Sequence, residues 1–173
     1  VQLVPPNQDL LIDAFCGAGF FAKALADKFE RVVGIDWDRF AIAAAKENAG
    51  AKETYIAGNI EEELSRTNLT ALSGQVSRIE TEVAAKTTVV VDPPAVGLSA
   101  QLRKTIVDLA PATLIYVSCN PATLARDLKD LQSRFKIESV TPLDMFPQTA
   151  EIEVVAHLRR FNDSTIERFN DFS

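Results

Sequence analysis

The feature of this chain that most constrains its fold is a repeated alternation between short, mostly apolar runs and longer amphipathic stretches. The runs predict buried strands at residues 10–15, 31–36, 53–57, 88–91 and 113–117. The stretches between them predict helices at residues 20–27, 39–48, 98–109 and 121–132, with one or two solvated helices in the polar segment 61–87. Strands that alternate with helices form a parallel sheet with helices on both faces.

The end of the chain departs from this alternation. Two further strands are expected at residues 136–142 and 152–159, and the loop of about nine residues between them leaves no room for a helix. They therefore predict an antiparallel hairpin at one edge of the sheet. The result is a seven-stranded, mostly parallel α/β sheet in one domain, residues 1–160, followed by a tail, residues 161–173, with weak helical spacing.

Composition narrows the classes of function. The chain has 173 residues, 47% of them apolar and 24% charged, and contains two cysteines and one histidine. No apolar run approaches the roughly 20 residues that a membrane helix needs. The cysteines lack metal-ligand spacing, so neither a metal site nor a disulfide framework is expected, and a reducing cytoplasm is the expected location. The net charge of −6 argues against a chain that binds nucleic acid unaided.

A glycine-rich turn follows the first predicted strand. In the segment Asp13–Gly19, Gly17 and Gly19 let the backbone approach a ligand at a helix start. The spacing is Gly-x-Gly, which differs from the longer motif of dinucleotide enzymes. Asp36, at the end of the second strand, is placed to accept the ribose hydroxyls of a nucleoside cofactor. The alternatives are a plain strand–helix turn and, for Asp36, an acid at a helix start beside Asp38.

Two more polar positions follow later strands. Asn59, after the third strand, is placed to contact an adenine edge, although a cap for the helix that follows is an equal alternative. Asp92 opens an Asp-Pro-Pro segment after the fourth strand. Prolines restrict both their own backbone and that of the residue before them. The segment is therefore expected to hold a carboxylate and carbonyl groups rigidly against a planar base.

Cys119 follows the fifth strand, at the edge where α/β sheets place their ligands. The helix expected from Pro121 onwards favours a thiolate at its amino terminus. A buried free cysteine is the alternative, but this position favours a nucleophile. Cys16, in the glycine turn, is expected to be a small packing residue.

Two glutamates precede or open the last strand. Glu151 and Glu153 are two residues apart, so their side chains are expected on one face, where one carboxylate can act as a base. A solvated strand end is the alternative. His157 is expected to be a packed strand residue.

Taken together, these residues resemble the RNA uracil-5 methyltransferases, which form 5-methyluridine in transfer and ribosomal RNA from S-adenosylmethionine. The matching segments are Asp-Ala-Phe-Cys-Gly-Ala-Gly (13–19), Asp-Pro-Pro-Ala-Val-Gly-Leu (92–98), Ser-Cys-Asn-Pro-Ala-Thr-Leu-Ala-Arg-Asp-Leu (118–128) and Asp-Met-Phe-Pro-Gln-Thr-Ala-Glu-Ile-Glu (144–153). The resemblance implies a Rossmann-like class I methyltransferase fold that binds S-adenosylmethionine. The family carries an upstream RNA-binding domain, so the chain is expected to be the catalytic domain of a longer protein.

The resemblance also implies roles for individual residues. Cys119 matches the nucleophile and Glu153 the general base. The cofactor-contacting positions match Phe15, Gly17, Gly19, Phe20, Asp36, Asn59 and Asp92. In this chemistry a thiolate adds to carbon 6 of uracil, carbon 5 takes the methyl group, and a carboxylate removes the proton from carbon 5. The base has to leave its stack, so a flipped or single-stranded uridine of transfer or ribosomal RNA is the expected substrate.

Other functions remain open. The chain can be a cofactor-binding module that is inactive alone, or a degenerate relative with a binding role. RNA cytosine-5 methyltransferases place a second cysteine after the fourth strand, where this chain has Pro94. Amino-group methyltransferases follow Asp-Pro-Pro with an aromatic ring, where this chain has Ala95.

Overall fold

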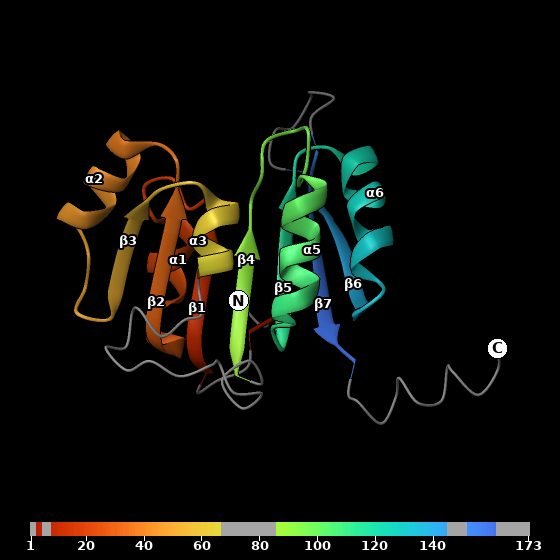
Figure 1. The fold of residues 1–173 in the computed structure, drawn as a ribbon, viewed down its shortest axis with the longest axis horizontal. Helices are drawn as coiled ribbons and strands as arrows, with labels where there is room; N and C mark the ends of the chain where they lie inside the picture. Colours follow the sequence, from red (N-terminus) through yellow and green to blue (C-terminus); the bar gives the residue numbers. More distant parts are fainter. Residues whose placement is uncertain (1–2, 5–7, 67–85, 145–151, 162–173) are drawn as a thin grey trace.

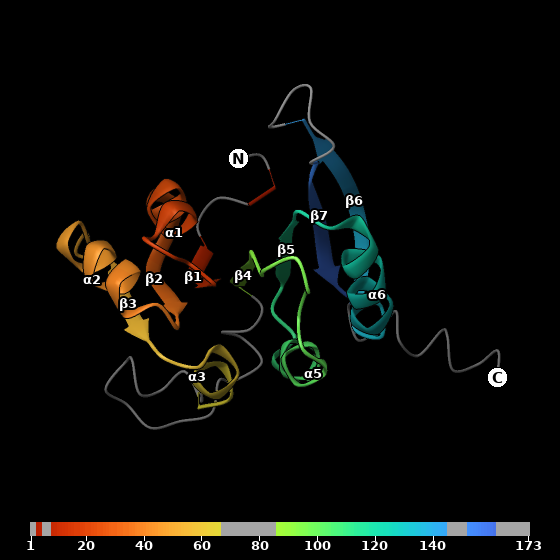
Figure 2. The ribbon, with the colours of Figure 1, turned by 90° about the horizontal axis from the view of Figure 1, so that it is seen from above.

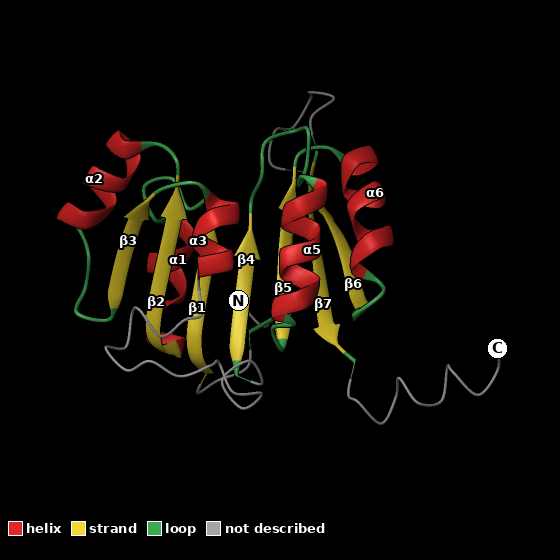
Figure 3. Cartoon of the chain, in the orientation of Figure 1, coloured by secondary structure: helices red, strands yellow, loops and turns green. Residues whose placement is uncertain are grey.

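A computed structural model describes residues 3–4, 8–66, 86–144 and 152–161 of the chain. The helices and strands alternate as predicted, up to an antiparallel pair at the end (Figure 1, Figure 3). The strands are β1 (Gln8–Ala14), β2 (Phe29–Asp36), β3 (Glu53–Ala57), β4 (Thr87–Val91), β5 (Thr113–Ser118), β6 (Phe135–Leu143) and β7 (Glu153–Arg160). The helices are α1 (Phe20–Leu25), α2 (Arg39–Glu47), α3 (Ile60–Arg66), α5 (Ala100–Leu109) and α6 (Pro121–Leu131), with a 3₁₀ turn η1 (Ala26–Lys28).

The strands form one seven-stranded sheet in the order β3-β2-β1-β4-β5-β7-β6. The pairs from β3 to β5 are parallel, whereas β7 runs antiparallel to both β5 and β6. The predicted hairpin is confirmed. Its second strand, β7, pairs with β5, so that its first strand, β6, lies at the edge of the sheet. The carboxyl ends of β1 to β5 and the beginning of β7 therefore meet along one edge of the sheet, the upper edge in Figure 1.

Each face of the sheet is covered by its own helices. Figure 2 shows α1 on one side, and α3, α5 and α6 on the other. Apolar residues of α1 and α2 pack against alternate positions of the strands, and those of α3, α5 and α6 pack against the remaining positions. Because successive strand residues point to opposite faces, a strand with two covered faces is apolar along most of its length. This accounts for the apolar runs of residues 89–91 in β4 and 114–117 in β5.

The helix starts follow local capping chemistry. Side chains of Asp38, Ser99 and Asn120 accept backbone N–H groups in the first turns of α2, α5 and α6. The helix predicted from Leu98 begins later, at Ala100, because Ser99 caps it. The helix predicted over 20–27 is shorter, since its last turn tightens into η1. Of the polar segment 61–87, α3 is the described helix, and the expectation for residues 67–85 lies outside the described residues.

The ring of Tyr55, on β3, lies close to two glycines, Gly19 of the glycine turn and Gly34 of β2. A Cβ atom on Gly34 would lie 2.5 Å from the Tyr55 ring, and one on Gly19 would lie 2.6 Å from the Tyr55 hydroxyl. Both glycines therefore leave space for this aromatic ring. None of the helices in the described part of the chain has both the length and the apolar composition that a membrane crossing requires.

Candidate functional site

Acidic side chains form a row along the upper edge of the sheet. Asp13, Asp36, Asp92 and Glu153 come from the ends of β1, β2 and β4 and from the beginning of β7. The strand alternation points Asp13 and Asp92 to the α1 side, because Leu11 and Val90, two residues earlier, pack in the core on that side. Burial raises the pKa of both Asp13 and Asp92. The charges of Asp92 and Asp36 raise the pKa of Asp13 further, and the charge of Glu153 raises that of Asp92 further. The four carboxyl groups are thus electrostatic neighbours.

Two of these acids hold the glycine turn. The Oδ2 atom of Asp36 accepts the backbone N–H of Gly17 at 2.8 Å, and Oδ2 of Asp13 accepts that of Ala22 at 2.8 Å. The backbone φ angles of Phe15, Gly17 and Gly19 are all positive, at 68°, 52° and 86°. This folds the turn tightly over the ends of β1 and β2.

Asp36 remains able to bind a ligand in this arrangement. Its Oδ1 atom also accepts the N–H of Asp38 at 2.9 Å, so each oxygen has one backbone donor. A carboxylate oxygen can accept two hydrogen bonds, which leaves capacity for ribose hydroxyls. Asp36 therefore lies at the start of α2, as in the second alternative, and its contact with ribose stays a prediction. Phe20, at the start of α1, is 75% exposed and is free to contact a ligand at this edge.

Asp13 has the most perturbed carboxyl group of the row. It is fully buried, and its Oδ1 atom has no hydrogen-bond partner among the described residues. Burial raises its pKa from 3.8 to about 7, although the Ala22 N–H lowers it and the neighbouring acids raise it further. The folded state therefore holds a proton on Asp13 at pH values where the unfolded chain has lost it.

This gives a pH dependence of stability that can be measured. Between pH 4 and 7 the folded state binds more protons at Asp13 than the unfolded state, so the free energy of unfolding falls as pH rises, by at most about 1.4 kcal/mol per pH unit. We expect Asp13→Asn to reduce the difference in unfolding free energy between pH 5 and pH 8, measured by urea titration. Asp38→Asn, which keeps a capping side chain, is the control. An unchanged difference in Asp13→Asn would contradict the assignment.

Cys119 lies at the same edge and is exposed. It sits between the end of β5 and the cap of α6, where the Ser118 hydroxyl donates to the Asn120 carbonyl at 3.0 Å and accepts its N–H at 3.1 Å. The backbone on both sides of the thiol is thus fixed. Cys16 differs: it is buried, and burial with the nearby Asp13 raises its pKa to about 12. The prediction that Cys16 is a packing residue is confirmed.

The strand register relates Cys119 to Glu153. In the antiparallel β5–β7 pair, Val117 lies opposite Val155 and Ser118 opposite Val154. The last pair of this ladder joins Ser118 to Val154, and the strand β5 ends there. Cys119 directly follows Ser118, and Glu153 directly precedes Val154. The two predicted catalytic residues therefore flank the same end of the β5–β7 ladder, and their roles stay predictions.

Asn59 serves as a helix cap. Its Oδ1 atom accepts the N–H groups of Glu61 and Glu62 at 2.9 and 3.2 Å, as in the second of the two alternatives. The residue before it, Gly58, donates its N–H to the Asp36 carbonyl at 2.9 Å. The exposed amide nitrogen of Asn59 thus stays beside the Asp36 end of the row, and its contact with adenine stays a prediction.

Two expectations concern residues away from the row. Glu151, the rival base, lies outside the described residues. His157 is half-buried, its buried Nε2 atom has no hydrogen-bond partner among the described residues, and burial lowers its pKa. This agrees with a packed strand residue. Within the described ranges there is no group of three or more His, Cys, Asp or Glu side chains that could hold a metal ion.

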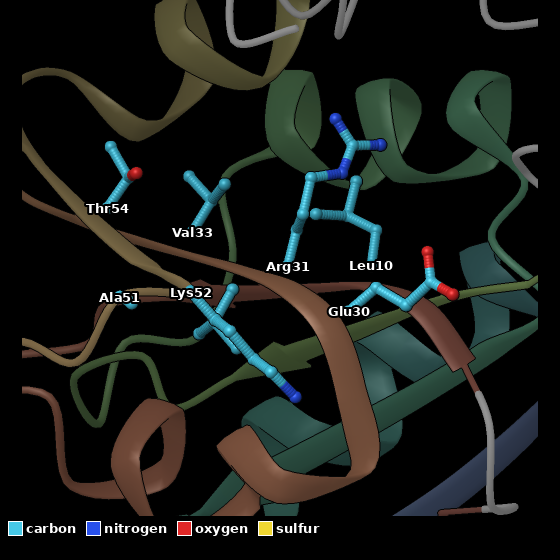
Figure 4. A pocket seen from close by; sticks show the side chains of 8 residues that line it. Leu10, Glu30, Arg31, Val33, Ala51, Lys52 and Thr54 are labelled. Carbon is cyan, nitrogen blue, oxygen red and sulfur yellow. The ribbon is translucent and has the colours of Figure 1, made fainter.

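A hollow elsewhere on the sheet does not belong to this site. Its lining includes Glu30, Arg31, Lys52 and Thr54, from the beginnings of β2 and β3 (Figure 4). In a parallel sheet these strand beginnings lie at the edge opposite the glycine turn. The Lys52 ammonium group donates to the Phe29 carbonyl at 3.0 Å, so this side chain is engaged in a structural contact.

One buried residue of the site region was not singled out in the sequence. Asp127 is fully buried in α6 and binds the segment that follows Asp-Pro-Pro through the Leu98 N–H at 2.7 Å. Its position in the sequence could have indicated its burial. Asp127 lies on the same face of α6 as Leu124, Leu128 and Leu131, which packs on the sheet. An acid at such a position requires buried partners.

The chain is similar to known methyltransferases over most of its length. It is 41% identical over 148 residues to an uncharacterized RNA methyltransferase of Halalkalibacterium halodurans, covering 85% of this chain and 30% of that protein. It is 39% identical over 158 residues to an uncharacterized RNA methyltransferase of Streptococcus agalactiae, covering 89% of this chain and 32% of the relative. The chain thus spans about a third of the length of these relatives.

Solved structures agree with this similarity. The Pyrococcus abyssi tRNA (uracil-54, C5)-methyltransferase, in complex with S-adenosyl-L-homocysteine, is 33% identical with a TM-score of 0.66, covering 91% of this chain and 35% of that one. The N-methyltransferase NodS of Bradyrhizobium japonicum has the same TM-score of 0.66 at 19% identity, covering 91% of this chain and 88% of its own, and shares the fold alone. The predicted Rossmann-like class I methyltransferase fold is confirmed.

The family model described as tRNA (Uracil-5-)-methyltransferase matches residues 2–161. This match spans the row of acids, the glycine turn, the Asp-Pro-Pro segment and Cys119. The chain therefore belongs to the tRNA (uracil-5-)-methyltransferase family.

Proposed function

We propose that this chain is the catalytic domain of an enzyme that methylates carbon 5 of a uridine in transfer or ribosomal RNA, with S-adenosylmethionine as methyl donor and Cys119 as nucleophile. The observation that carries the proposal is that the exposed Cys119 and Glu153 flank the last residue pair of the β5–β7 ladder, at the edge that also holds the glycine turn and Asp36. The family match and the neighbour with bound S-adenosylhomocysteine support the donor and the reaction class.

The residues at this edge fit the cofactor. S-adenosylmethionine supplies a methyl group on a positively charged sulfur. Asp36 has acceptor capacity for the ribose hydroxyls, the turn with Phe15, Gly17 and Gly19 gives close backbone approach, and Asp92 adds negative charge near the donor. A row of carboxyl groups favours a cationic ligand. Phe20 and Asn59 flank the same edge and complete the proposed cofactor contacts.

The proposed reaction divides between two side chains. The Cys119 thiolate adds to carbon 6 of the base, which makes carbon 5 nucleophilic, and carbon 5 then takes the methyl group. Glu153 removes the proton from carbon 5, and the electrons of that bond expel the sulfur from carbon 6. The enzyme then carries a proton on Glu153 and a free thiolate. Asp92 and the two prolines after it hold the base in place.

The RNA partner is proposed to bind largely through protein beyond this chain. The net charge of −6 does not suit phosphate binding over a broad surface, and the chain spans about a third of its relatives. Residues 1–160 form the proposed catalytic domain, and residues 161–173 its tail. Both cysteines of the described residues are free, which suits the reducing cytoplasm proposed as its location.

Transfer of a labelled methyl group tests this function. We expect the full natural protein that contains these residues to move the methyl of S-adenosylmethionine to carbon 5 of uridine, read by nucleoside mass spectrometry. Label on cytosine or on an exocyclic amine would contradict the reaction. A folded protein that binds the cofactor but modifies no RNA would instead favour the binding-module alternative.

Asp36 gives a second prediction at the cofactor. We expect Asp36→Ala to weaken S-adenosylmethionine binding by about 10- to 150-fold, since hydrogen bonds to a charged group contribute about 1.5–3 kcal/mol. Isothermal calorimetry on the 173-residue chain measures this. Asp38→Asn is the matched control, because it keeps the α2 cap and leaves the Gly17 contact intact. Equal losses in both variants would contradict a direct role for Asp36.

A further inference from the structure

The turn after Asp-Pro-Pro is held by helix α6 along its whole length. The Thr123 hydroxyl donates to the Ala95 carbonyl at 3.0 Å, and Nη2 of Arg126 donates to the Val96 carbonyl at 2.9 Å. Oδ2 of Asp127 accepts the Leu98 N–H at 2.7 Å. Successive backbone groups of the turn thus have partners on one face of one helix.

Asp127 is the centre of this network. Its carboxylate also accepts the Tyr116 hydroxyl of β5 at 2.7 Å, Nε of Arg126 at 2.9 Å and Nη1 of Arg103 at 3.0 Å. A fully buried carboxylate needs such compensation, because removal of its partners would leave an uncompensated charge. The network therefore joins β5, α5, α6 and the turn into one unit.

Gly97 allows this close approach. Its φ angle is +75°, and a Cβ atom there would lie 2.6 Å from Oδ2 of Asp127 and 2.8 Å from Nη2 of Arg126. The turn therefore touches the network through its backbone, where no side chain can intervene.

The two segments joined in this way carry different parts of the site. The turn begins with Asp92, and α6 begins immediately after Cys119 and Asn120. The hydrogen bonds of Arg126 and Asp127 therefore tie the segment that follows Asp92 to the helix that follows Cys119, although neither residue lies in the row of acids.

We propose that Arg126 and Asp127 are positioning residues, which hold the Asp92–Leu98 turn at the distance from Cys119 that thiol addition to the base requires. This rests on the proposed function. A misplacement of about 1 Å can cost about 100-fold in rate, so the effect should appear in the chemical step.

Arg126 is the better site for a test. Its side chain is 50% exposed, and in its absence Asp127 keeps Arg103, Tyr116 and the Leu98 N–H. Arg126→Ala should therefore fold. Arg126→Lys keeps the charge but lacks the planar fork that reaches Val96 and Asp127 together. Lys129→Ala, on an exposed position of the same helix, is the control.

The experiment uses two readouts. Hydrogen exchange on the 173-residue chain reports the turn: we expect the amides of residues 95–99 to exchange about 10-fold faster or more in Arg126→Ala, with Arg126→Lys between it and the unmodified chain. The rate of adduct formation between the full natural protein and RNA carrying 5-fluorouridine reports the chemistry. We expect a fall of about 10- to 100-fold, with cofactor affinity changed less than about twofold.

The outcomes separate the two proposals. Unchanged exchange in Arg126→Ala, or faster exchange with an unchanged adduct rate, overturns the positioning role. A loss of cofactor affinity equal to the loss of rate also overturns it, since that pattern indicates general disruption. If the unmodified protein forms no adduct, the proposed function fails, and the exchange readout still decides whether Arg126 holds the turn. Asp127→Asn, compared at matched folded fraction, should give a larger effect than Arg126→Ala.

Discussion

Replacement of Cys119 by alanine is expected to abolish the covalent adduct with RNA that carries 5-fluorouridine. Fluorine at carbon 5 cannot be removed as a proton, so the active enzyme is trapped on the RNA and runs as a slower band in a denaturing gel. Without the thiol, carbon 5 is not activated. Methyl transfer to normal RNA should then fall by about 10⁴-fold or more, as when other covalent nucleophiles are removed.

Cys16→Ala is the matched control for this experiment. Cys16 is buried, with a raised pKa of about 12, so it offers neither an accessible sulfur nor a thiolate at neutral pH. We expect Cys16→Ala to form the adduct. An adduct that survives Cys119→Ala, or a cross-linked peptide that contains Cys16, would transfer the nucleophile to the glycine turn.

Replacement of Glu153 by glutamine is expected to stop the reaction after methyl transfer. If Glu153 removes the proton from carbon 5, the variant should accumulate methylated RNA attached to Cys119 with normal uridine as substrate. Turnover should fall by about 10²–10⁴-fold, the usual contribution of a general base, while cofactor affinity hardly changes. The trapped complex is measured in a denaturing gel, and its methyl content by label.

Glu151→Gln separates Glu153 from its rival. We expect this variant to turn over without a trapped complex, because Glu153, which directly precedes the last residue pair of β7 with β5, is the proposed base. If Glu151→Gln traps the complex and Glu153→Gln does not, the base is Glu151.

Several features of the fold followed from local sequence. The apolar runs determined the strands, because a strand covered on both faces is apolar along most of its length. Asp38, Ser99 and Asn120 determined helix starts through bonds to backbone groups only two or three residues away. The short connection before the last strand determined the antiparallel hairpin. These are interactions between near neighbours, and sequence spacing reports them directly.

The candidate site could be located for the same reason. Asp36, Asp92 and Cys119 each follow an apolar run, and the carboxyl ends of parallel strands meet at one edge of a sheet. The family resemblance added the roles of Cys119 and Glu153. The electrostatic contact between Glu153 and Asp92 required the structure, since β7 has to lie next to β5 before the two charges approach.

Other features were decided only in the tertiary structure, because they depend on residues far apart in the chain. The order of the strands places β7 between β5 and β6, which no local pattern specifies. The proton held by Asp13 results from burial under α1 and from charges on β2 and β4. In the sequence, Asp127 is one of several charged residues of an amphipathic helix. It becomes a buried centre only when Tyr116, Arg103 and Leu98 are packed around it, and that packing is a property of the folded chain as a whole.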